Sequence, residues 1–192
     1  MKPHSDPELR EAIETLLLHF SWDVRPDARS EAAIALLSYG SAAAWARGMD
    51  MAKHDPDPRV RAMAWSRAVL ALHYGTPYGE SVSVWPNHIP IIFLPEIFDS
   101  ERLVQDLLAA LRTDDGEWEV QRVDRHPFLP YSRKSTHTRA VREYIARDLR
   151  MAEPQHPLLT AGLLDLIAKG PPEVAAVAEM ALPFDFDPAS LK

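Results

Sequence analysis

The stretch DVRPDARSEA at residues 23–32 is the main indication of the fold, because a related stretch, DPDPRVRAMA, follows at residues 55–64. In both copies an Asp is followed after three residues by a Pro and after six by an Arg. A stretch rich in Ala and aliphatic residues comes next. The two copies are thirty-two residues apart. A fixed period of this size is typical of stacked helix pairs, each of which buries its apolar face against its neighbours.

Helix start and stop signals around these copies predict two helix pairs within residues 6–75. Ser5 or Asp6 is a good N-cap for the first helix, and Gly40 and Gly75 are good stop signals after the second and fourth. The four expected helices end at His19, Tyr39, His54 and Tyr74.

The Arg of each copy is expected to lie in the apolar face of its helix. At about 100° per residue, Arg29 and Arg61 both fall among Ala and aliphatic positions. A guanidinium directed into an apolar face is costly unless it is paired. The sequence therefore predicts the Asp six positions earlier, Asp23 or Asp55, as the partner of each Arg.

This pattern of Asp, Pro and Arg ahead of small and aliphatic residues resembles the HEAT family of helical repeats. The resemblance covers residues 6–75 and, more weakly, residues 157–182, where Lys169 and Ala175 stand at the Asp and Arg positions. It implies an all-α fold, a HEAT-like α-solenoid of stacked helix pairs, in which Asp and Arg residues form hydrogen-bonded ladders between repeats. In this chain the ladder residues would be Asp23, Arg29, Asp55 and Arg61.

The rest of the chain departs from the repeat pattern. We nevertheless expect residues 1–192 to form a single domain. Residues 76–130 are expected to form an irregular, Pro-rich insertion with one amphipathic helix at 100–112. Ser81–Trp85 and Glu117–Val123 alternate like short strands, which suits a small β-hairpin or an extended loop. Residues 131–192 should hold a tail and helices over 135–151, 157–169 and 172–182.

Composition and charge narrow the class of protein. The chain has no cysteine, no apolar run of membrane-spanning length and no apolar core of a signal peptide, so we expect a cytoplasmic protein. Residues 121–150 hold eight basic and three acidic residues, a charge of +5. Because the whole chain carries −7, the remainder carries −12. This distribution argues against general nucleic-acid binding and predicts a localised electrostatic contact.

The residue patterns of common catalytic and metal sites are missing. None of the eight histidines lies in an HExxH motif, and the sequence has neither a GxSxG elbow nor a phosphate-binding glycine loop. We therefore expect no catalytic residues, no metal ligands and no cofactor, with His126 and His137 as the one histidine pair worth testing. A small hydrolase or lyase within the insertion stays open as an alternative.

The strongest candidate for a binding surface is the helix expected over residues 135–151. Val141, Ile145 and Leu149 form its apolar stripe, and four arginines lie together on another side. Arginine suits planar, bidentate capture of carboxylate or phosphate, whereas internal ion pairing on a solvated face is the alternative. The expected partner-binding residues are Arg139, Arg142, Arg147 and Arg150, together with Arg59 and Arg67 on the second helix of a pair.

These features predict a non-catalytic protein–protein interaction module that binds an acidic partner. A small acidic binder of this kind suits an inhibitor or immunity protein and equally an adaptor. The alternative from another class is nucleic-acid binding or base excision, which some HEAT-like proteins perform. That alternative would need a broad basic track along the molecule.

Overall fold

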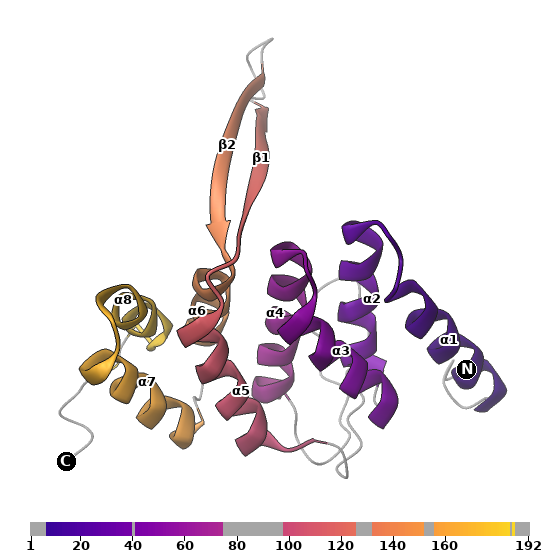
Figure 1. Cartoon of the computed structure of the whole chain (residues 1–192), viewed down its shortest axis with the longest axis horizontal. Helices are drawn as coiled ribbons and strands as arrows, with labels where there is room; N and C mark the ends of the chain where they lie inside the picture. The colour runs from indigo at the N-terminus through magenta and orange to yellow at the C-terminus, as the bar shows by residue number, and fades with distance from the viewer. Residues whose placement is uncertain are drawn as a thin grey trace.

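The described part of the chain is mostly helical and carries one small antiparallel sheet (Figure 1). The computed structural model describes residues 7–39, 41–74, 98–125, 132–151, 156–184 and 186. Its elements, in chain order, are α1 (Pro7–Phe20), α2 (Pro26–Tyr39), α3 (Ala42–His54), α4 (Pro58–Tyr74), α5 (Ser100–Thr113), β1 (Glu117–Arg125), β2 (Ser132–Ala140), α6 (Val141–Met151), α7 (Pro157–Lys169) and α8 (Pro172–Ala181).

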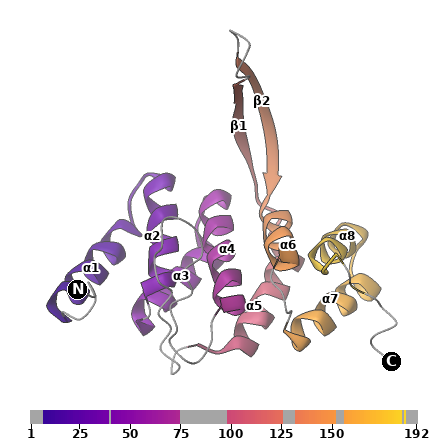
Figure 2. The ribbon, with the colours of Figure 1, turned by 180° about the vertical axis from the view of Figure 1, so that it is seen from behind.

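The helices associate as consecutive pairs, and the second helix of each pair packs against the next second helix (Figure 1). The pairs are α1 with α2, α3 with α4, α5 with α6, and α7 with α8. In the row of second helices, α4 packs between α2 and α6, and α6 packs between α4 and α8. Figure 2 shows the same order from behind, with α1 and α8 near opposite ends of the molecule. Turns of neighbouring pairs are thereby brought close together.

Local sequence explains where most helices begin. Five of the helices in the described part of the chain start at a proline. A proline suits this position because it has no backbone N–H that would be left unpaired there, and because its fixed backbone angle matches the first turn of a helix. Ser41 caps α3 and Asp99 caps α5, each by accepting a hydrogen bond from the backbone N–H three residues on. The helix boundaries expected from the sequence therefore agree with the structure to within a few residues, with α6 as the exception.

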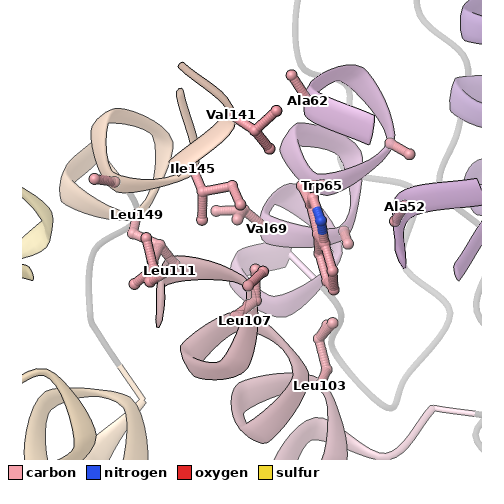
Figure 3. Close-up of a cluster of buried hydrophobic side chains, with 14 of the residues drawn as sticks. Ala52, Ala62, Trp65, Val69, Leu103, Leu107, Leu111, Val141, Ile145 and Leu149 are labelled. Carbon is pink, nitrogen blue, oxygen red and sulfur yellow. The ribbon is translucent and has the colours of Figure 1, made fainter. Parts of the chain in front are cut away.

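A continuous apolar core runs along the row of helices. In Figure 3 Trp65 and Val69 of α4 lie close to Leu107 of α5 and Ile145 of α6, and all four side chains are buried. Burying a Leu or Ile side chain of this kind stabilises the fold by about 1.5–3 kcal/mol. The core therefore joins successive pairs to one another as well as the two helices within a pair.

The sheet is a hairpin that rises from the helical body between α5 and α6 (Figures 1 and 2). Its strands are antiparallel, and the register begins with Glu117 opposite Ala140 at the base. The helix expected to start at Ser135 was wrong: Ser135 lies in β2, and α6 begins at Val141. The cause is pairing with β1, a contact between distant positions that overrides the local periodicity.

The strand expected at Glu117–Val123 is present as part of β1, and its partner is β2. The other strand predicted from alternation, Ser81–Trp85, lies outside the described residues, as do Gly40, Gly75 and His126.

Candidate binding surface

Three turns of the same design follow the first helices of the first three pairs. Asp23, Asp55 and Asp114 each accept a hydrogen bond on a carboxylate oxygen from the backbone N–H two residues on, at 2.8, 2.9 and 3.1 Å. An Asp side chain bonded in this way closes a turn locally. In the first two pairs the second helix follows at once, whereas in the third pair the hairpin intervenes.

Arg29 links the first of these turns to the second. Its guanidinium donates to both carboxylate oxygens of Asp55, at 2.8 and 2.9 Å, and to the backbone carbonyl of Asp23 at 3.0 Å. The two side chains are only 12% and 4% exposed, and the hydrogen bond to Asp55 raises the pKa of Arg29. The carboxylate partner expected from the sequence, Asp23, instead bonds Arg25, which lowers the pKa of Asp23 to about 2.

Arg61 repeats this arrangement one pair further along. It donates two hydrogen bonds to the carboxylate of Asp114, both at 2.8 Å, and one to the backbone carbonyl of Asp55, also at 2.8 Å. The bond to Asp114 raises the pKa of Arg61. The expected carboxylate pairing of Arg61 with Asp55 was therefore wrong. Each guanidinium points along the row of second helices. It therefore bonds the carboxylate of the next Asp and only the backbone carbonyls of its own turn.

Asp114 is a ladder residue that the sequence analysis missed. It follows α5 as Asp55 follows α3, but no Pro and Arg come after it at the spacing of the other copies. The sequence feature that could have indicated this turn is an Asp-x-Gly sequence directly after an amphipathic helix. Gly116 allows the close approach, because a Cβ there would lie 2.1 Å from a nitrogen of Arg61 and 2.9 Å from the Cβ of Pro58.

Val141 occupies the ladder position of the third pair. Its N–H donates to the carbonyl of Gly116 at 2.9 Å, just as the N–H of Arg61 donates to the carbonyl of Asp57 at 3.2 Å. Val141 is fully buried and packs in the core shown in Figure 3, so it offers no cation to a fourth turn. Residues 117–140 are thus an insertion into a turn of the repeating design.

Aromatic rings and arginines gather where the hairpin meets α6. The rings of Trp118 in β1 and Tyr144 in α6 meet edge to face, with centroids 5.9 Å apart. The guanidinium carbons of Arg147 and Arg139 lie 4.3 and 5.9 Å from the centroid of the Tyr144 ring, within the range of cation–π attraction. Both arginines are exposed. We call Trp118, Arg139, Tyr144 and Arg147 the Tyr144 surface.

The other two arginines of the expected arc lie elsewhere on α6. Arg142 is half-buried and, at about 100° per residue, is roughly 200° around the helix from Tyr144. Arg150 donates to the backbone carbonyls of Leu182 and Glu179, at 3.1 and 3.4 Å, and so satisfies the end of α8. One arc of four arginines is therefore not formed, because Arg139 lies on a strand and the helix begins after it.

The two arginines predicted on α4 both reach toward α2. Arg59 pairs with Asp27, and the two side chains are 49% and 77% exposed. Arg67 was expected on the polar face, but it is half-buried and donates to the hydroxyl of Ser38. Burial lowers the pKa of the Arg67 guanidinium. These side chains link two neighbouring pairs and lie apart from the Tyr144 surface.

Two grooves of about 420 and 370 Å³ lie beside α3 and α5, and Arg61 and Trp65 of α4 also line the smaller one. Both are lined by Lys53, His54 and Asp106, and an ion pair of 2.6 Å between Lys53 and Asp106 spans them. Thr113 carries the one hydroxyl among the described lining residues, and it donates to a carbonyl of its own helix at 3.0 Å. These grooves therefore present no hydroxyl or thiol poised beside a base.

Across the described ranges, no three His, Asp or Glu side chains lie close enough to hold a metal ion together. None of the helices in those ranges combines the length and apolar character needed to span a bilayer. Comparisons with protein-family models, with curated proteins and with solved structures gave no match.

Proposed function

We propose that the chain is a HEAT-like α-solenoid that acts as a non-catalytic protein-binding module. Two features support the repeat assignment: the row of second helices and the hydrogen-bonded links between neighbouring pairs, Arg29 to Asp55 and Arg61 to Asp114. Stacks of this kind offer a rigid, extended surface to other proteins. An inhibitor of the immunity type and an adaptor would both use such a surface, and the identity of the partner separates the two.

The Tyr144 surface is the proposed contact, and the partner is an acidic protein. The observation that carries this proposal is the exposed pair of arginines around one ring, at the base of a hairpin with a basic strand. The Nε and one Nη of Arg147 donate long hydrogen bonds of 3.4 and 3.3 Å to one oxygen of Asp148, and 53% of the Arg147 side chain stays exposed. A carboxylate of the partner would compete with Asp148 for this planar edge, which suits bidentate capture. The segment 121–150 adds a local charge of +5 on a body of −12.

The test is charge reversal at the Tyr144 surface. A partner is captured from the native host with the tagged chain, purified, and titrated against the variants by calorimetry. We expect the double variant Arg139→Glu/Arg147→Glu to bind at least about tenfold more weakly, since like charges then face each other. Arg59→Glu is the matched control and should change affinity by less than about twofold. A double variant with full affinity, or a partner without an acidic surface, would contradict the proposal.

Nucleic-acid binding is the second candidate, and the shape of the hairpin is the observation that favours it. A two-stranded β-ribbon fits the major groove of duplex DNA, and β2 carries three basic residues. The charge of −12 outside residues 121–150 opposes it, because DNA-binding surfaces need a broad basic track. We expect a 20-base-pair duplex to bind weakly and to lose affinity steeply with added salt. Tight binding at physiological salt would instead make the hairpin a phosphate-binding element.

A further inference from the structure

Within the described residues the hairpin has two open edges. Its sheet there consists of two strands, each nine residues long. In an antiparallel pair every second residue directs its backbone N–H and C=O away from the partner strand. Such groups form a template to which a further strand can be added.

The register identifies which residues of β2 face outward. The N–H of Val141 donates to the carbonyl of Gly116, and these two residues extend the observed register by one step below the base of the hairpin. This single bond sets the phase of the ladder, so the pairs above it alternate, starting with the non-hydrogen-bonded pair of Glu117 and Ala140. The backbone groups that face away from β1 are those of Thr136, Thr138 and Ala140, and those that face β1 belong to His137 and Arg139.

The two edges differ in charge. β2 carries three basic residues and no acidic one, whereas β1 carries three acidic residues and two basic ones. Near the base of the hairpin β1 packs against α4, and β2 packs against α6, into which it leads directly. Arg139 belongs both to β2 and to the Tyr144 surface, so the β2 edge is continuous with the proposed contact. The charge of β2 complements an acidic strand.

We propose that the acidic partner adds an extended segment to the hairpin as a third strand along β2. This inference rests on the proposed function and names its mode of recognition. The backbone groups of Thr136 and Thr138 exchange hydrogen bonds with the incoming strand, and Arg139, together with the net positive charge of the β2 sequence, selects acidic residues in it. Affinity then comes largely from main-chain bonds, and specificity from charge.

The first experiment uses a defined probe in place of the natural partner. The probe is a labelled nine-residue peptide of alternating Glu and Val with blocked ends, and a Lys–Val peptide of equal length is its control. Thr138→Pro removes one outward N–H and no bond to β1, so it should weaken binding of the acidic peptide about tenfold or more. Thr138→Ala keeps the N–H and should change binding by less than about twofold. No binding of the acidic peptide, or equal binding of the Lys–Val peptide, overturns the inference.

The second experiment needs no variant and remains decisive if Thr138→Pro disturbs the hairpin. Amide exchange of the unaltered protein is followed by NMR with and without the acidic peptide. We expect exchange to slow about tenfold or more at Thr136 and Thr138, with little change at His137 and Arg139. Binding without this alternating protection overturns strand addition but leaves the electrostatic contact standing, if Arg139→Glu/Arg147→Glu still abolishes it. The same protection without peptide, rising with protein concentration, would identify a second copy as the occupant and also overturn the inference.

Discussion

Replacing Arg61 by Ala should destabilise the protein strongly, because Arg61 holds two turns of the stack together. The substitution removes three hydrogen bonds and leaves the Asp114 carboxylate with its bond to the N–H of Gly116. Removing one partner of a fully buried ion pair costs about 3–5 kcal/mol. The side chains of Arg61 and Asp114 are 16% and 11% exposed, so water reaches part of the pair. We therefore expect a loss of roughly 2–4 kcal/mol in the free energy of unfolding.

The matched control is Arg59→Ala, two residues earlier on the same helix. Its pair with Asp27 is largely exposed, so the loss should not exceed about 0.5 kcal/mol. Urea titration followed by circular dichroism measures both variants, and a thermal melt should show a drop of roughly 5–15 °C for Arg61→Ala. A double-mutant cycle with Asp114→Asn isolates the pair, and the coupling should exceed about 1 kcal/mol. Equal midpoints for the two Ala variants, or no coupling, would refute the ladder as a source of stability.

Two further predictions test the turns. Gly116→Ala should lower the free energy of unfolding by about 1–3 kcal/mol, because the added Cβ would lie 2.1 Å from the Arg61 guanidinium. Urea titration measures this loss. An unchanged midpoint would mean that the turn shifts freely to make room. Arg25→Ala should raise the pKa of Asp23 from about 2 toward the ordinary value of 3.8 for an Asp carboxyl, as measured by NMR titration of its carboxyl carbon. Because the pKa of Asp23 is depressed in the folded state, its contribution to stability is present above the unfolded pKa and is lost as pH falls toward about 2. A pKa that stays near 2 in the variant would show that Arg25 is not the cause.

Much of the helical framework could be predicted from the sequence because its signals are local. A proline at the first position, an Asp or Ser cap and an apolar stripe act within one or two turns of helix. They gave the boundaries of α2, α4 and α7 closely. The cost of an unpaired guanidinium in an apolar face also indicated that Arg29 and Arg61 must be paired.

The tertiary structure alone decided which partner each of these arginines takes. Asp23 and Asp55 are nearer in sequence to their own Arg, but the carboxylates that receive Arg29 and Arg61 belong to the next turn along the row. The stacking of pairs sets that distance, and no local pattern contains it. Asp114 was missed for the same reason, since the hairpin separates it from the residue at the ladder position.

The binding surface divides in the same way between local and nonlocal causes. Composition alone located the excess of arginine between residues 121 and 150. Pairing of β2 with β1 then made a strand of residues that read as the start of a helix, and this moved Arg139 off the helix that carries Arg147. Strand pairing joins positions far apart in the sequence. The free energy that it contributes depends on the folded arrangement and cannot be read from a local stretch. The sequence by itself determined that the helices form and that charge gathers in one segment, and tertiary contacts decided which of those charges meet on one surface.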